Sequence, residues 1–124
     1  MTRPEDAATA AGIDAADVEL SVAQTLLHSE DGAAVDAARH LLTSVEAELG
    51  RLASATETDT ETAGRLVTVR ADLSGHLLAA GALETAGAPA DGVARMLRRA
   101  AGIARAGLAA SGAPEPTPVG AGRR

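Results

Sequence analysis

The sequence predicts an all-α fold, either a four-helix bundle or a pair of helical hairpins with coiled-coil-like heptad packing. Strong helix formers, above all Ala, Leu, Glu and Arg, dominate the body of the chain. Apolar residues recur at alternating steps of three and four, which is the period of one helix face. β-branched residues are too few and too scattered to form strands. Breaks that contain Gly or Pro divide the pattern into four helical segments.

The first predicted helix begins near Asp14, whose carboxylate can cap free backbone N–H groups. The polar, Gly-containing stretch at residues 29–32 ends it. Its apolar face consists of residues three and four positions apart, namely Ile13, Ala16, Leu20, Ala23 and Leu27.

The second predicted helix, residues 33–53, carries the clearest periodic signal in the chain. Charged residues such as Asp36, Arg39 and Glu46 lie between its apolar positions, as an exposed face requires. We expect its apolar seam to form the core or an oligomer interface. The seam consists of Val35, Ala38, Leu42, Val45, Leu49 and Leu52.

The third predicted helix covers residues 61–85 and continues the heptad step. Gly75 and Gly81 lie inside it, where small residues let two helix backbones approach closely. His76 falls on the seam, which predicts a hydrogen-bonded core histidine. The seam consists of Leu66, Val69, Leu73, Ala80 and Leu83, with Leu77 beside it.

Two breaks flank the third helix. The first is the Thr- and acid-rich segment at residues 54–62, in which Thr58 and Glu61 have the spacing of a capping box. The second, at residues 87–89, contains Gly and Pro and precedes a fourth predicted helix at residues 90–110. The seam of the fourth helix consists of Val93, Met96, Ala100, Ile103 and Gly107.

The predicted domain organisation is simple. A helical bundle domain at residues 13–111 follows a flexible N-terminus at residues 1–12. A Pro- and Gly-rich tail at residues 112–124 has prolines at alternate positions, which predicts a disordered, partly polyproline-II segment.

The composition excludes several kinds of chemistry. The chain has no Cys, so disulfides, thiolate metal sites and cysteine nucleophiles are ruled out. It has no Phe, Tyr or Trp, so aromatic cages and base-stacking platforms are ruled out as well. The bias towards Ala, Gly, Arg and Val indicates a high-GC, bacterial type of genome. Because Ala fills many inward positions, the core is thin, which predicts self-association, most simply as a dimer.

We expect a cytoplasmic protein without a membrane segment. No apolar run approaches the roughly 18 residues that a membrane span needs. The N-terminus also lacks the basic and apolar regions of a signal peptide.

Charge is divided unevenly along the chain. Residues 1–62 carry 13 acids and three Arg, a net charge of −10, whereas residues 63–124 carry four acids and eight Arg, a net charge of +4. Four arginines are predicted to form one basic outer face on the fourth helix. They are Arg95, Arg98, Arg99 and Arg105. This face can be solvated or paired with the acidic half, bind an acidic protein, or bind nucleic acid, which the overall pI near 4.9 disfavours.

Residues 78–100 resemble a DNA-binding helix-turn-helix motif. Gly87 occupies the turn, Val93 follows six residues later, and Met96 or Leu97 supplies the next aliphatic position. The resemblance places Arg95, Arg98 and Arg99 on the recognition helix. The sequence departs from the motif at Leu83, where Ala is usual, and in the lack of a polar base-reading residue at residues 90–92.

Candidate metal and catalytic residues are few. Asp36 with His40, and Asp72 with His76, each place a carboxylate and an imidazole four residues apart, so two such pairs on facing helices could ligate a metal. The Glu-x-x-His pattern of di-iron bundles is absent. No nucleophile elbow, phosphate-binding loop or dinucleotide fingerprint occurs in the sequence, so no enzyme activity and no cofactor are predicted.

The sequence therefore predicts a non-catalytic, self-associating helical protein that acts as a protein-interaction or regulatory module. A small helix-turn-helix regulator that uses the Arg-rich fourth helix is the alternative, and a carboxylate/His metal-binding bundle is the third possibility. The predicted partners are a second copy of the chain and an unidentified protein.

Overall fold

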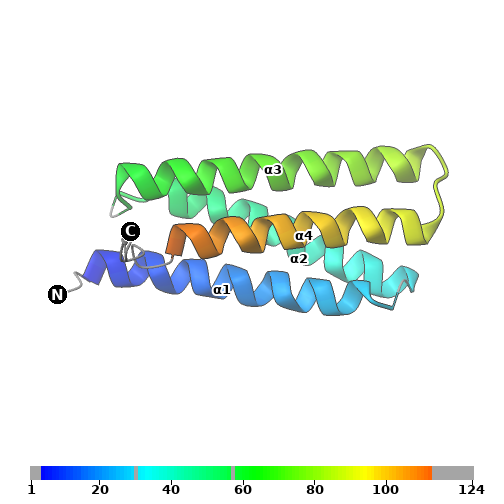
Figure 1. Cartoon of the computed structure of the whole chain (residues 1–124), viewed down its shortest axis with the longest axis horizontal. Helices are drawn as coiled ribbons and strands as arrows, with labels where there is room; N and C mark the ends of the chain where they lie inside the picture. The colour runs from blue at the N-terminus through cyan, green and yellow to red at the C-terminus, as the bar shows by residue number, and fades with distance from the viewer. Residues whose placement is uncertain (1–3, 30, 57, 113–124) are drawn as a thin grey trace, which may run out of the picture.

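The computed structural model describes residues 4–29, 31–56 and 58–112, and these residues form an all-α four-helix bundle (Figure 1). The helices are α1 (Pro4–Leu27), α2 (Gly32–Ser54), α3 (Thr60–Thr85) and α4 (Ala90–Gly112). The predicted fold class is thus confirmed. The predicted tail lies outside the described residues, apart from the last residue of α4.

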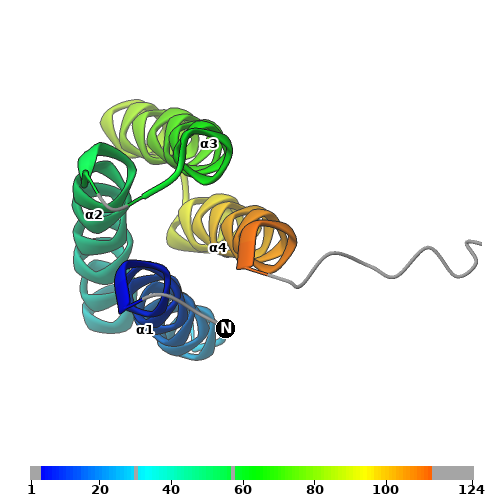
Figure 2. The same cartoon turned by 90° about the vertical axis from the view of Figure 1, so that its left-hand side faces the viewer.

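Successive helices run antiparallel, in an up-down-up-down order (Figure 1). Each helix packs against its neighbours in sequence, and α4 also packs against α1, so the bundle closes on itself (Figure 2). Across the diagonals, α2 touches α4, whereas within the described residues α1 and α3 do not touch. The short connections, each only a few residues long, enforce this antiparallel arrangement.

The predicted apolar faces of α1 and α2 form the core. Every predicted face residue of α1 is buried, and the α2 seam is buried from Val35 to Leu49, with Leu52 half-buried against it. The buried residues of α3 are Leu66, Val69, Leu73 and Ala80. The α2 seam is therefore part of the bundle core.

The predicted seam of α4 is correct at Val93 and Ala100 but wrong at Met96 and Ile103, because the buried face lies further round the helix. Leu97, Ala104 and Leu108 are buried, whereas Met96 is half-buried and Ile103 is 40% exposed. A shift of one residue turns the buried face by about 100° around the helix axis. The buried face of α4 consists of Val93, Ala94, Leu97, Ala100, Ala101, Ala104 and Leu108. Met96 and Leu97 are adjacent, large and apolar, so the predicted and the observed buried face of α4 both look apolar in the sequence. The spacing of apolar residues therefore does not show which of the two faces is buried.

The close helix contacts occur at glycines other than those predicted. A Cβ at Gly12 would lie 2.6 Å from a methyl carbon of Leu52, and one at Gly107 would lie 2.5 Å from Cγ2 of Val69. These two glycines let α1 approach α2 and let α4 approach α3. By contrast, apart from the local backbone of α3 itself, no atom of the described residues lies within 4 Å of a Cβ built at Gly75 or Gly81, so the predicted close approach there is wrong.

Helix α1 begins ten residues before the predicted start at Asp14. The structure therefore places residues 4–12 in a helix and not in a flexible segment. Thr9 is buried, and its hydroxyl lies 3.2 Å from the hydroxyl of Thr58 in the α2–α3 connection. Together with the Gly12 contact, this anchors the first turns of α1, which the Ala-rich sequence favours as helix.

The connections are held by local hydrogen bonds. Asp31 caps α2, and Asp59 caps α3 by accepting from the Thr62 N–H at 2.7 Å. Asp59 thus takes the capping place predicted for Thr58, and its bonds to the backbone and side chain of Thr62 lower the pKa of its carboxyl. Gly87, with φ of 82°, ends the α3 helix in a Schellman-type turn, in which Ala88 N–H donates to the Leu83 carbonyl at 2.9 Å.

Substitution of Gly107 tests the close packing of α4 on α3. Gly107→Ala should lower the free energy of unfolding by about 1–3 kcal/mol, because Val69 must move to admit the new Cβ. Gly75→Ala is the control, since open space surrounds that glycine, and it should raise the stability by about 0.5–1 kcal/mol. Urea unfolding followed by circular dichroism measures both, and stabilisation by both variants would contradict the close approach.

Substitution of Leu42 tests the core. Leu42 is fully buried, so Leu42→Ala should cost about 2–5 kcal/mol. Leu78, on α3, is 76% exposed, and Leu78→Ala should change the stability by no more than about 0.5 kcal/mol. Thermal unfolding of the two variants should separate them clearly, and equal midpoints would mean that the buried face of α2 is assigned wrongly.

Candidate interaction surfaces

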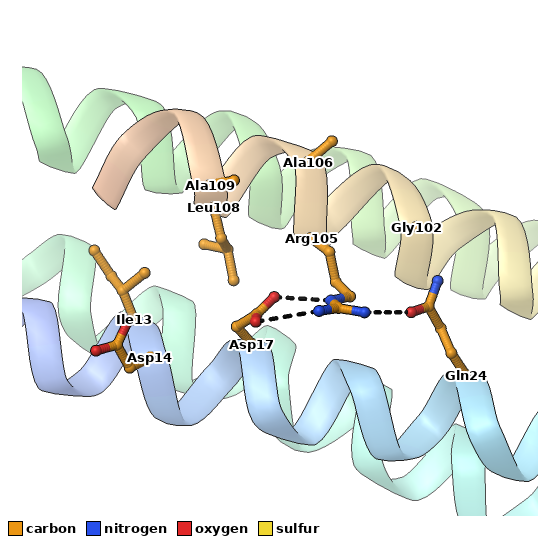
Figure 3. A pocket seen from close by; sticks show the side chains of 9 residues that line it. All are labelled: Ile13, Asp14, Asp17, Gln24, Gly102, Arg105, Ala106, Leu108 and Ala109. Carbon is orange, nitrogen blue, oxygen red and sulfur yellow. Dashed lines mark hydrogen bonds and ion pairs between the residues drawn. The ribbon is translucent and has the colours of Figure 1, made fainter. Parts of the chain in front are cut away.

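The four arginines predicted to form one basic face differ in what they contact. Arg105 reaches across to α1, where its Nε and Nη2 donate to the two carboxylate oxygens of Asp17 at 2.9 and 3.4 Å. Its Nη1 donates to the side-chain oxygen of Gln24 at 2.9 Å (Figure 3). The hydrogen bond and the charge of Asp17 raise the pKa of Arg105.

Arg98 contacts the end of α1. Its Nη1 donates to the carbonyl of Leu27, the last residue of that helix, at 3.2 Å. The last turn of α1 has no basic residue of its own, so a cation from α4 stabilises its free carbonyls and its negative dipole end. Arg65 of α3 plays the same part for α4, with its Nη1 3.4 Å from the carbonyl of Ala110.

Arg95 and Arg99 remain on the outside of α4. Arg95 lies 3.5 Å from the Asp91 carboxylate of the same helix, and Arg99 is exposed. The one-residue shift of the buried face explains why two of the arginines contact α1, because it turns Arg98 and Arg105 towards that helix. Of the four arginines predicted to form an interaction face, Arg98 and Arg105 thus contact α1, and Arg95 and Arg99 are exposed.

A groove of about 540 Å³ lies between α1 and α4, the first and last helices of the bundle (Figure 3). Apolar side chains line one end of it, including Ile13 and Leu108. The network of Asp17, Arg105 and Gln24 lines the other end. The one guanidinium of this network, that of Arg105, already donates to Asp17 and Gln24, so the network joins α1 to α4. The sequence analysis missed Asp17 and Gln24, since nothing in the sequence gives the register of α4 against α1.

A second groove of about 380 Å³ lies between α2 and α3. Here Arg39 pairs through Nη1 with Glu84, and the Ser74 hydroxyl donates to the Glu46 carboxylate. The Nε and Nη2 atoms of Arg39 are buried and have no hydrogen-bond partner among the described residues. Arg39 was predicted to lie on an exposed face, but its position next to the α2 seam directs it towards α3.

The predicted Asp/His pairs do not assemble a metal site among the described residues. No group of three or more His, Asp or Glu side chains there has the proximity that a metal ion needs. His76 is half-buried, and its Nδ1 donates to the backbone carbonyl of Asp72 at 2.8 Å, so it is bound to its own helix and is not a core histidine. Asp36 and His40 are exposed on α2.

The segment that resembles a helix-turn-helix forms an antiparallel hairpin. Helices α3 and α4 lie side by side along their lengths (Figure 1), whereas the two helices of a helix-turn-helix cross at about 90–120°. Gly87 does occupy the turn, and Val93 and Leu97 are buried, as the motif spacing requires. The geometry of the pair is nevertheless that of a bundle hairpin.

Helix α1 presents an uncharged outer face to solvent, which the sequence analysis missed. Six residues at alternating steps of three and four are all exposed, with Val18 at 61% and Val22 at 47%. We call this surface the α1 outer face, and it consists of Ala8, Ala11, Ala15, Val18, Val22 and Thr25. The expected helix start at Asp14 concealed the pattern, because two of its alanines precede that residue.

The other helices differ from α1 in this respect. A solvent-facing helix surface normally carries charged side chains. The outward surfaces of the other three helices do so, with Asp36 and Arg51 on α2, Arg70 and Asp72 on α3, and Arg95 and Arg99 on α4. The charged residues of α1 whose side chains are described, including Asp14 and Glu19, lie to either side of the α1 outer face.

Among the described residues, no helix combines the length and the apolar character that crossing a membrane requires. The fold and surfaces define the protein as an up-down-up-down four-helix bundle with one uncharged outer helix face. Comparisons with protein-family models, with curated proteins and with solved structures find no match.

Exchange of Arg98 tests its contact with the end of α1. Arg98→Glu should lower the free energy of unfolding by about 1–2 kcal/mol, because it replaces a cation at the helix C-terminus by an anion. Arg99→Glu makes the same charge change at the adjacent exposed position and should cost no more than about 0.5 kcal/mol. Chemical unfolding measures both, and equal losses would show that only net charge matters.

Proposed function

We propose that this protein is a non-catalytic, self-associating helical module that acts by binding protein surfaces through the α1 outer face. The observation that carries the proposal is the exposure of Val18 and Val22 on a helix face without any charged residue. An exposed apolar stripe of this kind gains free energy when another apolar surface covers it. The stripe itself carries no charge that would have to be desolvated, and the exposed Asp14, four residues before Val18, lies on its flank.

The dimensions of the α1 outer face suit a single helix. From Ala8 to Thr25 the stripe is about 26 Å long at 1.5 Å per residue, and a packed helix is about 10 Å across. Such a contact covers roughly 300 Å² on each side, below the roughly 800 Å² of a standard protein interface. We therefore propose that this association is weak and depends on the protein concentration.

The distribution of the arginines supports protein binding over nucleic-acid binding. Arg98 and Arg105 are engaged with α1, and Arg95 has a carboxylate neighbour. The helix with the uncharged face is also the one whose flanks carry acids, such as Asp14 and Glu19. Phosphate would be repelled there, whereas an apolar protein surface would not.

Self-association is the test of the proposed function. Light scattering coupled to size exclusion, at about 10–100 μM, should report a mass that rises with concentration towards a dimer. Val18→Glu places a charge in the α1 outer face and should leave a monomer with an unchanged helical circular-dichroism signal.

Val67→Glu is the matched control, because Val67 is 55% exposed on α3, away from the α1 outer face. It should associate like the unaltered protein. A monomer over the whole concentration range would reject the proposed function, and equal loss of association in both variants would place the interface elsewhere.

A further inference from the structure

The residues of the α1 outer face are arranged by size. The first three, Ala8, Ala11 and Ala15, are small, and the last three, Val18, Val22 and Thr25, are larger and β-branched. The spacing is also symmetric, since the steps between successive residues are three, four, three, four and three. The spacing of the residues is therefore the same from either end of the stripe, whereas the order of side-chain size is reversed.

We propose that the occupant of the α1 outer face is the same face of a second copy of this chain, packed antiparallel about a twofold axis that passes between residues 16 and 17. The inference rests on the proposed function and gives it a geometry. One register then pairs every small residue with a large one. The pairs are Ala8 with Thr25, Ala11 with Val22, and Ala15 with Val18 of the second copy, each formed twice.

The competing arrangements fit less well. In a parallel pair, Ala would face Ala and Val would face Val, which leaves gaps in one half and crowding in the other. The antiparallel pair places a small residue opposite a large one in each layer. A twofold contact also uses the same face of both copies, so the dimer leaves no copy of this apolar face exposed. The close approach that alanines allow also increases the contact between the two helices.

The charges beside the stripe also agree with this register. In an antiparallel pair, each flank of one helix meets the same flank of the other. Asp14 then lies nearest to Ser21 of the second copy, and Glu19 lies nearest to its Gly12. The acids on the flanks of α1 thus face uncharged residues, and no pair of carboxylates is brought into direct contact.

An exchange of residue size tests the register. Ala15→Val should weaken association about tenfold, because a valine then faces Val18 of the second copy in both layers. Val18→Ala should weaken it about three- to tenfold by leaving gaps. The double variant Ala15→Val with Val18→Ala restores the pairing in reverse and should return to within about threefold of the original dissociation constant.

Both positions are exposed in the single chain, so the helical circular-dichroism signal and the unfolding midpoint should change little in these variants. Sedimentation equilibrium measures the dissociation constants. A double variant that associates as weakly as the two single effects combined would overturn the antiparallel register.

Cross-linking tests the direction of the helices, and the chain has no Cys of its own to interfere. Ala8→Cys and Thr25→Cys variants, mixed and mildly oxidised, should form a disulfide between unlike chains. Each variant alone should not cross-link, because identical positions lie about 25 Å apart along an antiparallel pair, far beyond the reach of a disulfide.

Cross-linking of each variant with itself would indicate a parallel pair and overturn the inference. The absence of any cross-link in a protein that still associates would overturn the inference and leave the proposed self-association standing. A protein that remains monomeric in sedimentation equilibrium would contradict both the antiparallel register and the proposed self-association.

Discussion

The thin, alanine-rich core is the constraint on which the rest of the structure depends. Alanine buries little area, so the helices gain enough contact only by approaching one another closely. Gly12 against Leu52, and Gly107 against Val69, show how this is achieved: a missing side chain on one helix receives a branched side chain from the next. Sites of this kind fix the register of a helix pair, because a slide by one residue would put a Cβ or a backbone in the place of the gap.

The register of α4 then determines where its charges go. Burial of Leu97 and Leu108 turns Arg98 and Arg105 towards α1, and both find partners there, at the Leu27 carbonyl and at Asp17 with Gln24. Core packing and the polar contacts thus favour the same orientation of α4. The contacts of Arg105 also join the first helix to the last (Figure 3), which closes the bundle at a point where no chain connection does so.

Much of the fold could be predicted from the sequence, since a repeat such as the α2 seam defines a single helix face and therefore a buried side. The face of α4 could not, because adjacent large residues at Met96 and Leu97 support two faces one residue apart. The start of α1 was misplaced because Asp14 looks like a capping residue, whereas Thr9 and Gly12 make contacts with residues far along the chain. Pairings such as Arg39 with Glu84 depend on the register between helices, which a single sequence does not contain.

The uneven charge of the sequence bears on the α1 outer face in an indirect way. Three arginines of the second half, Arg65, Arg98 and Arg105, contact helix ends or the inner flank of α1. The acids Asp14 and Glu19 of α1 lie beside the stripe. Two copies of a chain with a net charge of −6 repel each other at long range, and salt screens that repulsion over about 8–10 Å. Apolar contact between two α1 outer faces involves no ion pair that salt could weaken. Salt therefore acts on such a dimer with the opposite sign from its effect on phosphate binding, which it weakens by counterion competition. The stripe can thus serve as a self-association surface on an acidic protein because it is uncharged and its flanking acids meet no carboxylate of the second copy.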